Sequence, residues 1–442
     1  MRRIGAHSVL KAATSYASLT LVVKAAAFAR EAVIAAVFGV SGSMDAYFMA
    51  LVVIGLPCGL LLNSAQTIYI RDFVVVSRNQ GKDAASRFLS NTVAGVLGTM
   101  VGILALWLIF LPQIVEIVGF GFTADQRLLL KDCVYGLVVN YFLTGINLIG
   151  YGALQARKDF TPGALIPIVV PIVTVAMVFL IGSDLRGLIG GLTLGALVET
   201  VLVYRRLSYS GLTPFRWRLG IGDRESLRRL ALGTAVLMPS TLFSGLAPVI
   251  EQGIASRLGE GAVSSLGYAA KFPALINGIL VTAVGVTVLP HFSEMLANGE
   301  IERCRRFFLR YALLLATCGM VIAIVAIALS EPLVRIAFQR GVFTIQNTYT
   351  VTNLQQAYLL QIPGQLVGIL SLRMLVATAA LRAVTTVFVV VIPFGGLVQW
   401  WLSSLWGAVG VAYGTSLSVS LWALCLTTCV LLLFRSDLVK KT

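Results

Sequence analysis

The stretch VAGVLGTMVGILALWLIFL at residues 93–111 decides the fold, because it runs for nineteen residues without a charged side chain. A helix of that length rises about 28 Å, close to the thickness of about 30 Å of a bilayer's hydrocarbon core. Similar stretches recur along all 442 residues, of which 58% are hydrophobic and only 12% charged. Soluble domains carry roughly 25% charged residues. The sequence therefore predicts an all-α integral membrane protein, since a membrane barrel would show short alternating strands instead.

The apolar stretches divide into about twelve predicted transmembrane helices. They lie near residues 14–38, 45–66, 88–115, 133–154, 160–181, 187–204, 230–255, 264–290, 309–330, 349–377, 383–401 and 407–434. The first carries Lys24, Arg30 and Glu31 and lacks a small-residue cleavage site, so we expect a retained helix and not a signal peptide.

Basic residues fall mainly in alternate loops. On the side of the two termini the loops hold twenty-four Lys and Arg residues, and on the opposite side only six: Arg127, Lys131, Arg186, Arg257, Arg335 and Arg340. Cytoplasmic loops of membrane proteins carry such an excess. Both termini are therefore expected in the cytoplasm, and the net charge of +15 is explained by topology, so no nucleic-acid partner is expected.

The two halves of the chain resemble each other at an offset of about 220 residues. Arg87-Phe88 recurs as Arg306-Phe307, and Phe122-Thr123 recurs as Phe343-Thr344. The expected organisation is an N-terminal lobe at 1–205, a basic cytoplasmic linker at 206–229 and a C-terminal lobe at 230–442. Each lobe would hold six helices, with a pseudo-twofold axis along the membrane normal. Many secondary transporters are built from parallel repeats of this kind.

Ionisable residues inside the spans are the candidate functional residues. A charge that faces lipid costs at least about 2.5 kcal/mol, so these side chains should face a hydrated cavity or one another. Lys24, Arg30 and Lys271 are predicted to line a cavity, and their positive charge favours a substrate that bears phosphate. Glu199 is expected to pair with Arg205 or Arg206.

Three acidic residues accompany these cations. Glu31 follows Arg30 directly, and Glu251 lies in the seventh span. Asp45 opens the second span, where it could line the cavity or simply complement the dipole of its helix.

Metal, redox and enzymatic roles find no support in the sequence. The six cysteines form no CxxC pair, and only two histidines occur. We therefore expect no metal site and no cofactor. The longest loop is basic and lacks paired carboxylates, so a membrane glycan polymerase or ligase is not expected and the chain is interpreted as a carrier.

Several motifs resemble the MviN/MurJ family of lipid II flippases, in the multidrug/oligosaccharidyl-lipid/polysaccharide exporter superfamily. The resemblance is carried by FAREAVIAAVFG at 28–39 with DAYF at 45–48, by GALQARKDF at 152–160, by GVTVLPHFS at 285–293 and by GVFT at 341–344. It runs through nearly the whole chain.

The resemblance implies a two-lobed bundle that moves an undecaprenyl-pyrophosphate-linked saccharide from the inner to the outer leaflet by alternating access. It implies a multi-pass protein of the bacterial inner membrane, active in peptidoglycan biosynthesis or polysaccharide export. The expected partners are the lipid-linked glycan, membrane lipids and glycan-assembly proteins. The implied substrate-binding residues are Lys24, Arg30, Lys271, Glu31 and Asp45, and Glu251 is the implied ion-coupling residue.

Departures from the family pattern leave more than one function open. Lysines stand at 24 and 271 where the family has arginine, and Cys58-Gly59 lies near the family's arginine pair. The glycan could be lipid II or an exopolysaccharide or capsule intermediate. A drug/cation antiporter of the same superfamily and a non-transporting membrane scaffold for glycan assembly also remain compatible with the sequence.

Overall fold

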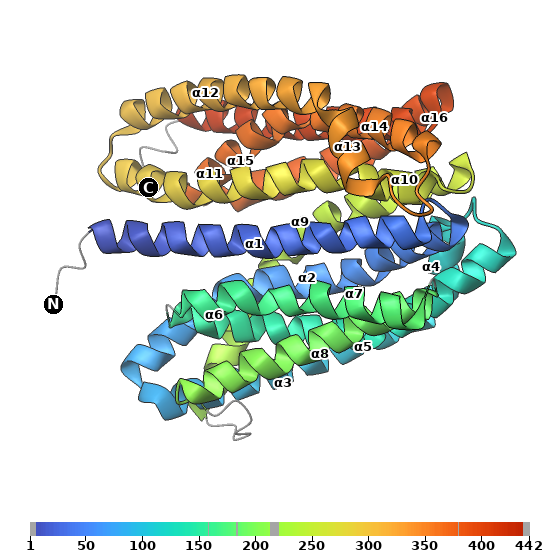
Figure 1. Cartoon of the computed structure of the whole chain (residues 1–442). Helices are drawn as coiled ribbons and strands as arrows, with labels where there is room; N and C mark the ends of the chain where they lie inside the picture. Colours follow the sequence, from blue (N-terminus) through green and yellow to red (C-terminus); the bar gives the residue numbers. More distant parts are fainter. Residues whose placement is uncertain (1–5, 158, 183, 213–220, 379, 436–442) are drawn as a thin grey trace. The chain divides into compact units, whose positions relative to one another are not determined.

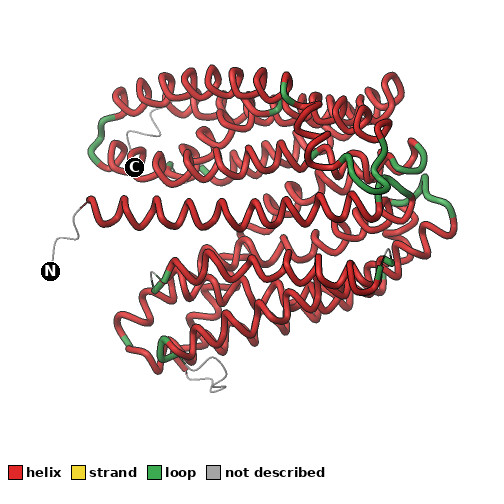
Figure 2. The backbone as a smooth tube through the Cα atoms, in the orientation of Figure 1, coloured by secondary structure: helices red, strands yellow, loops and turns green. Residues whose placement is uncertain are grey.

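The computed structural model of the chain describes residues 6–157, 159–182, 184–212, 221–378 and 380–435. Within these ranges the backbone is helical almost throughout and contains no strand (Figure 2). The helices in chain order are α1 (Ala6–Phe38), α2 (Gly42–Asn79), α3 (Gly81–Ile109), α4 (Leu111–Val118), α5 (Ala124–Ala156), α6 (Phe160–Leu165), η1 (Ile166–Ile168), α7 (Val169–Ile181), α8 (Leu185–Tyr209), α9 (Ile221–Ala255), η2 (Ser256–Leu258), α10 (Ala262–Ala269), α11 (Lys271–Ala297), α12 (Ile301–Ala328), α13 (Ser330–Phe338), α14 (Ile345–Leu359), α15 (Ile362–Ala377) and α16 (Leu381–Arg435).

The predicted all-α membrane class is confirmed. Each of the twelve predicted spans falls on helices, although the spans 88–115, 264–290, 309–330 and 349–377 each contain a break of one or two residues. By length and composition, eight helical stretches among the described residues are long and apolar enough to cross a membrane. One of these, at 381–434, has 54 residues, far more than one crossing requires. The number of twelve stays a prediction.

The chain forms two compact units. Unit 1 comprises Met1–Phe38, Ala46–Ile117 and Thr123–Gly245, and unit 2 comprises Gly39–Asp45, Val118–Phe122 and Leu246–Thr442. Two short segments from the first half of the sequence, 39–45 and 118–122, thus belong to unit 2. The division into lobes at residues 205 and 230 stays a prediction. Residues 213–220 of the predicted linker lie outside the described residues, as do 1–5 and 436–442 at the termini.

Unit 1 is held together by close helix packing. Helix α1 packs on α6 and α7, α5 packs on α3 and α8, and α7 packs on α8 (Figure 1). Glycines allow the last of these contacts, because a Cβ at Gly191 would lie 2.8 Å from Thr174 Cα, and one at Gly195 would lie 2.9 Å from Val170 Cα. Small residues let helix backbones approach closely in membranes.

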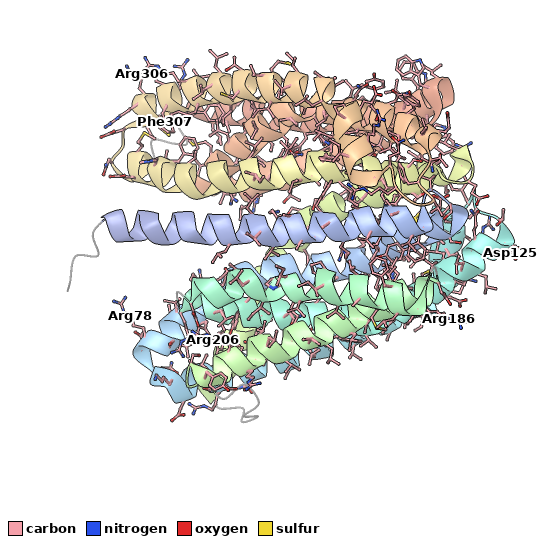
Figure 3. All side chains as sticks on the ribbon, viewed as in Figure 1. Arg78, Asp125, Arg186, Arg206, Arg306 and Phe307 are labelled. Atoms are coloured by element: carbon pink, nitrogen blue, oxygen red, sulfur yellow. The ribbon has the colours of Figure 1, made fainter. Side chains whose placement is uncertain are left out.

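The charged ends of unit 1 match the predicted loop pattern. Figure 3 shows Arg78 and Arg206 at one end of the unit and Asp125 and Arg186 at the other. Arg78 and Arg206 were assigned to the side of the termini, and Arg186 to the opposite side. The two groups therefore lie at opposite ends of unit 1, as predicted from the loops.

Unit 2 is organised around α15, which packs against α11, α12 and α16 (Figure 1). Its apolar core includes Phe292, Phe308, Leu370 and Leu426, all fully buried. Between α14 and α15 the helix breaks just before Pro363, which cannot donate the backbone hydrogen bond that would continue it.

Helix α16 is a hairpin of two helices. Its backbone leaves helical geometry at Trp406 and Gly407, where Gly407 has a φ of +58° that favours glycine. A Cβ at Gly414 would lie 2.7 Å from Gln399 Cα, so the residues after the kink fold back onto those before it. The kink thus coincides with the boundary between the two last predicted spans.

Candidate substrate and ion sites

Helix α1 carries three of the predicted site residues. Glu31 is 7% exposed and pairs with Arg30, whose side chain is 20% exposed. The Arg30 Nε is buried without a hydrogen-bond partner. Lys24 is partly buried, and among the described residues no hydrogen bond or ion pair reaches it. Arg30 is therefore largely neutralised by Glu31, whereas no described residue pairs with the charge of Lys24.

Asp45 and Glu260 cap each other's helices within unit 2. Asp45 is 0% exposed, and its two carboxylate oxygens accept 2.6 Å hydrogen bonds from the backbone N–H groups of Gly261 and Ser264, at the start of α10. In return, Glu260 accepts a 2.8 Å bond from the backbone N–H of Gly42, the first residue of α2. Carboxylates at helix N-termini satisfy unpaired N–H groups and complement the dipole.

This arrangement decides what Asp45 does in the present conformation. Both of its oxygens are occupied by backbone N–H groups, so it acts here as a helix cap. The segment that contains it is fixed further by the Tyr268 hydroxyl, which donates to the Gly39 carbonyl at 3.1 Å. A substrate-binding role for Asp45 stays a prediction.

Glu251 joins three helices of unit 2. Its carboxylate accepts hydrogen bonds from the Tyr358 hydroxyl of α14 and, at 3.1 Å, from the Thr415 hydroxyl of α16. Sequence reasoning did not find these partners, because they lie more than 100 residues away and sit among many other Tyr and Thr residues. Among the described residues no group of three or more His, Cys, Asp or Glu side chains is gathered.

Lys271 is the first residue of α11, directly after the short helix α10. The predicted span at 264–290 is therefore interrupted at Ala270. Lys271 is partly buried at this break, and it belongs to unit 2, whereas Lys24 and Arg30 belong to unit 1.

The expectation for Glu199 was wrong. Arg206 forms a two-bond ion pair with Asp159, at 2.8 and 3.1 Å, and Arg205 donates to the Tyr209 hydroxyl. Glu199 instead accepts hydrogen bonds from α5. The available signal was the four-residue spacing of Asn147 and Tyr151, which places both side chains on one face of α5.

Most of the sequence is similar to one protein family. The family model described as "Lipid II flippase MurJ" matches residues 34–436. A curated relative from Rickettsia prowazekii (strain Madrid E), "Probable lipid II flippase MurJ", is 25% identical over 364 residues, covering 79% of this chain and 69% of the relative. The "Lipid II flippase MurJ" of Burkholderia cenocepacia is 24% identical over 392 residues, covering 83% of this chain and 72% of the relative.

Solved structures share the fold. One described as "Lipid II flippase MurJ, inward closed conformation" aligns with a TM-score of 0.75 at 20% identity, over 94% of this chain and 87% of its own. An inward-facing multidrug resistance MATE family transporter of the MOP superfamily aligns with a TM-score of 0.73 at 12% identity, over 96% of this chain and 99% of its own. Since the family model spans most of the sequence, the chain belongs to the lipid II flippase MurJ family.

Proposed function

We propose that this protein moves a lipid-linked saccharide pyrophosphate from the inner to the outer leaflet of the bacterial inner membrane by alternating access. Lipid II is the substrate in the names of its relatives, and other undecaprenyl-pyrophosphate-linked glycans present the same phosphates. The observation that carries the proposal is Lys24, a cation on an apolar helix that has no protein partner among the described residues.

The energetics of Lys24 favour an anionic ligand. A lysine at the centre of a membrane span costs about 2.5 to 3.5 kcal/mol unless it is paired or hydrated. A pyrophosphate supplies several strong acceptors for an ammonium group. On the same helix, Arg30 retains the unpaired Nε–H, which we propose as a second donor, while Glu31 orients the guanidinium. A cationic drug would gain nothing from this set of charges.

We extend the proposal to Lys271 and Asp45. Lys271 is proposed to contribute a cation from unit 2, because a lysine in an apolar membrane helix favours an anionic ligand. Asp45 can meet substrate only after its bonds to Gly261 and Ser264 break. Glu251 is proposed as the ion-coupling residue, because the Tyr358 and Thr415 hydroxyls that bond it are neutral.

Orientation and partners belong to the same proposal. The basic end of unit 1 that carries Arg78 and Arg206 is proposed to face the cytoplasm, with both termini on that side (Figure 3). The substrate and membrane lipids would be its molecular partners, together with proteins that assemble the glycan. The chain carries the glycan and does not modify it.

The decisive experiment measures leaflet position directly. Cells depleted of their own flippase would be complemented with this chain, and lipid-linked intermediate accessible from outside would be measured with a leaflet-specific probe. Lys24→Ala is expected to abolish external accumulation, whereas Lys24→Arg, which keeps the charge, should retain it. Lys82→Ala serves as the matched control, because Lys82 is an exposed lysine at the start of α3.

The outcomes separate the function from the site. If the wild-type chain leaves all intermediate in the inner leaflet, the flippase proposal fails. If Lys24→Ala and Lys271→Ala both retain wild-type transport at normal expression, the substrate-site assignment fails and the function stands. Comparing lipid II with an exopolysaccharide intermediate in the same assay identifies the glycan.

A further inference from the structure

A further acidic residue, Glu199, is held between two helices of unit 1. Glu199 lies on α8, partly buried, and both of its carboxylate oxygens accept hydrogen bonds from α5. The Tyr151 hydroxyl donates to Oε1 at 2.6 Å, and the Asn147 Nδ2 donates to Oε2 at 3.1 Å. Glu199 lies seven residues before Arg206, so it sits about 10 Å along the helix from that charged end.

In the part of the chain that the structure describes, no Lys or Arg side chain bonds to this carboxylate. Among the described residues, Asn147 and Tyr151 are the only hydrogen-bond partners of Glu199. The nearest arginines along α8 are bonded elsewhere, Arg206 to Asp159 and Arg205 to the Tyr209 hydroxyl.

Helix α5, which packs on α8, has its charged residues Asp125, Arg127, Lys131 and Asp132 fifteen or more positions before Asn147, and its tyrosines at 135, 141 and 151. The sequences of α6, η1 and α7, which lie along α8 or adjoin it, contain no ionisable residue. On α8 itself, the Tyr204 hydroxyl donates to the Ile146 carbonyl at 3.0 Å and is thus engaged. A bare carboxylate inside a membrane span, held only by neutral donors, requires a proton or a cation.

A second observation points to the ligand. The Asn147 Oδ1 is buried without a hydrogen-bond partner, and Asn147 is only 4% exposed. This oxygen belongs to the same planar carboxamide whose nitrogen contacts Glu199. The two ends of a carboxamide have nearly the same shape, so either end fits against Oε2. With its nitrogen facing Oε2, the amide donates to a carboxylate and also, at 3.4 Å, to the Ala196 carbonyl. With its oxygen facing Oε2, the amide accepts a bond from a carboxylic acid and gives up the long bond to Ala196.

We propose that Glu199 is a proton-binding site within unit 1, with Asn147 and Tyr151 as its positioning residues. A proton from solvent water adds to Oε2 and forms one O–H bond, the Asn147 amide turns to accept it, and no electron is transferred. Release reverses these steps. The site is distinct from Glu251, which lies in unit 2. A role for the Glu199 site in transport rests on the proposed function, whereas proton binding at Glu199 does not.

The test observes the proton itself. Infrared difference spectra of the purified full chain in lipid would be recorded from about pH 4 to about pH 9, a range that brackets ordinary and strongly perturbed carboxyl groups. A carboxylic-acid band that titrates in the wild type should be lost in Glu199→Gln and retained in Glu251→Gln. The Glu251 variant is the matched control, since that residue also has a tyrosine and a second neutral donor as partners.

Further variants keep the proposal falsifiable if Glu199→Gln does not fold. Tyr151→Phe removes one donor to the carboxylate and should move the midpoint of the same band toward higher pH, because a hydrogen bond to the charged form is lost. Asn147→Leu should shift the band frequency. An unchanged titration in all three variants would overturn the proposal. Loss of the band on adding NaCl at fixed pH would also overturn it, in favour of a sodium ion.

Transport then tests the consequence. In vesicles with an imposed pH gradient, lipid translocation by the wild type should change with the gradient, and Glu199→Gln should respond less. If the wild type translocates no lipid while the Glu199 band still titrates, the proposed function fails and the proton site stands. If translocation proceeds and no band titrates, the proton site fails alone.

Discussion

Replacing Asp45 should lower the free energy of unfolding of unit 2, by an amount set by the two hydrogen bonds that its carboxylate accepts. The carboxylate is fully buried and accepts from Gly261 N and Ser264 N, each at 2.6 Å. A hydrogen bond to a charged group contributes about 1.5 to 3 kcal/mol. Asp45→Asn keeps one acceptor oxygen and turns an N–H group toward the other donor, so we expect a loss of about 2 kcal/mol. Asp45→Ala loses both bonds and should cost about 4 kcal/mol.

The measurement is thermal unfolding of the purified chain in detergent, followed by intrinsic fluorescence. For a unit of roughly 200 residues, a loss of about 2 kcal/mol lowers the melting temperature by about 4 to 8 °C. Glu260→Gln is the matched control, since it keeps an oxygen for the Gly42 N–H and its side chain is exposed. It should cost less than about 1 kcal/mol. An Asp45→Asn variant that melts within about 1 °C of the wild type would refute the capping account.

Two further predictions concern unit packing. Gly414→Val would place atoms against Gln399, where even a Cβ lies 2.7 Å from the Cα, so the α16 hairpin should lose about 1 to 3 kcal/mol in thermal unfolding. Gly190→Ala is its control, because no atom lies within 4 Å of the added Cβ, and it should leave stability unchanged or raise it. Arg257→Ala should alter the emission of Trp400, over whose ring the guanidinium lies at 3.7 Å, and cost about 0.5 to 1 kcal/mol; unchanged fluorescence would contradict the stacking.

The helical membrane fold could be predicted from the sequence because long apolar runs leave the backbone no other partner than itself. The break between the last two spans could be placed as well, since the kink at Trp406 and Gly407 lies where the predicted span 407–434 begins. The break before Pro363 inside a predicted span follows from the proline itself, which cannot donate the backbone hydrogen bond that continues a helix.

The candidate site was less accessible to sequence reasoning. Lys24, Arg30 and Glu31 could be singled out because charge is rare in an apolar helix, and their local pairing follows from adjacency. The partners of Glu251 could not be singled out, because they come from two other helices more than 100 residues away. For Glu199, the spacing of Asn147 and Tyr151 places both side chains on one face of α5, but it does not show that this face meets α8. Arg206 lies close to Glu199 in the sequence, yet it pairs with Asp159. Both side chains of that pair are partly exposed, so solvent reduces the desolvation penalty of the two charges.

The bonds of Asp45 also set an order in time during biosynthesis. They join residues 216 and 219 positions apart along the chain. A ribosome adds about 5 to 20 residues per second, so α2 enters the membrane about 10 to 40 s before α10 exists to receive its carboxylate. During that interval the N–H groups at the start of α2 depend on water, since Glu260 has not yet been made. A truncated translation product that ends before α10 therefore keeps a charged, uncapped helix end that the finished protein covers.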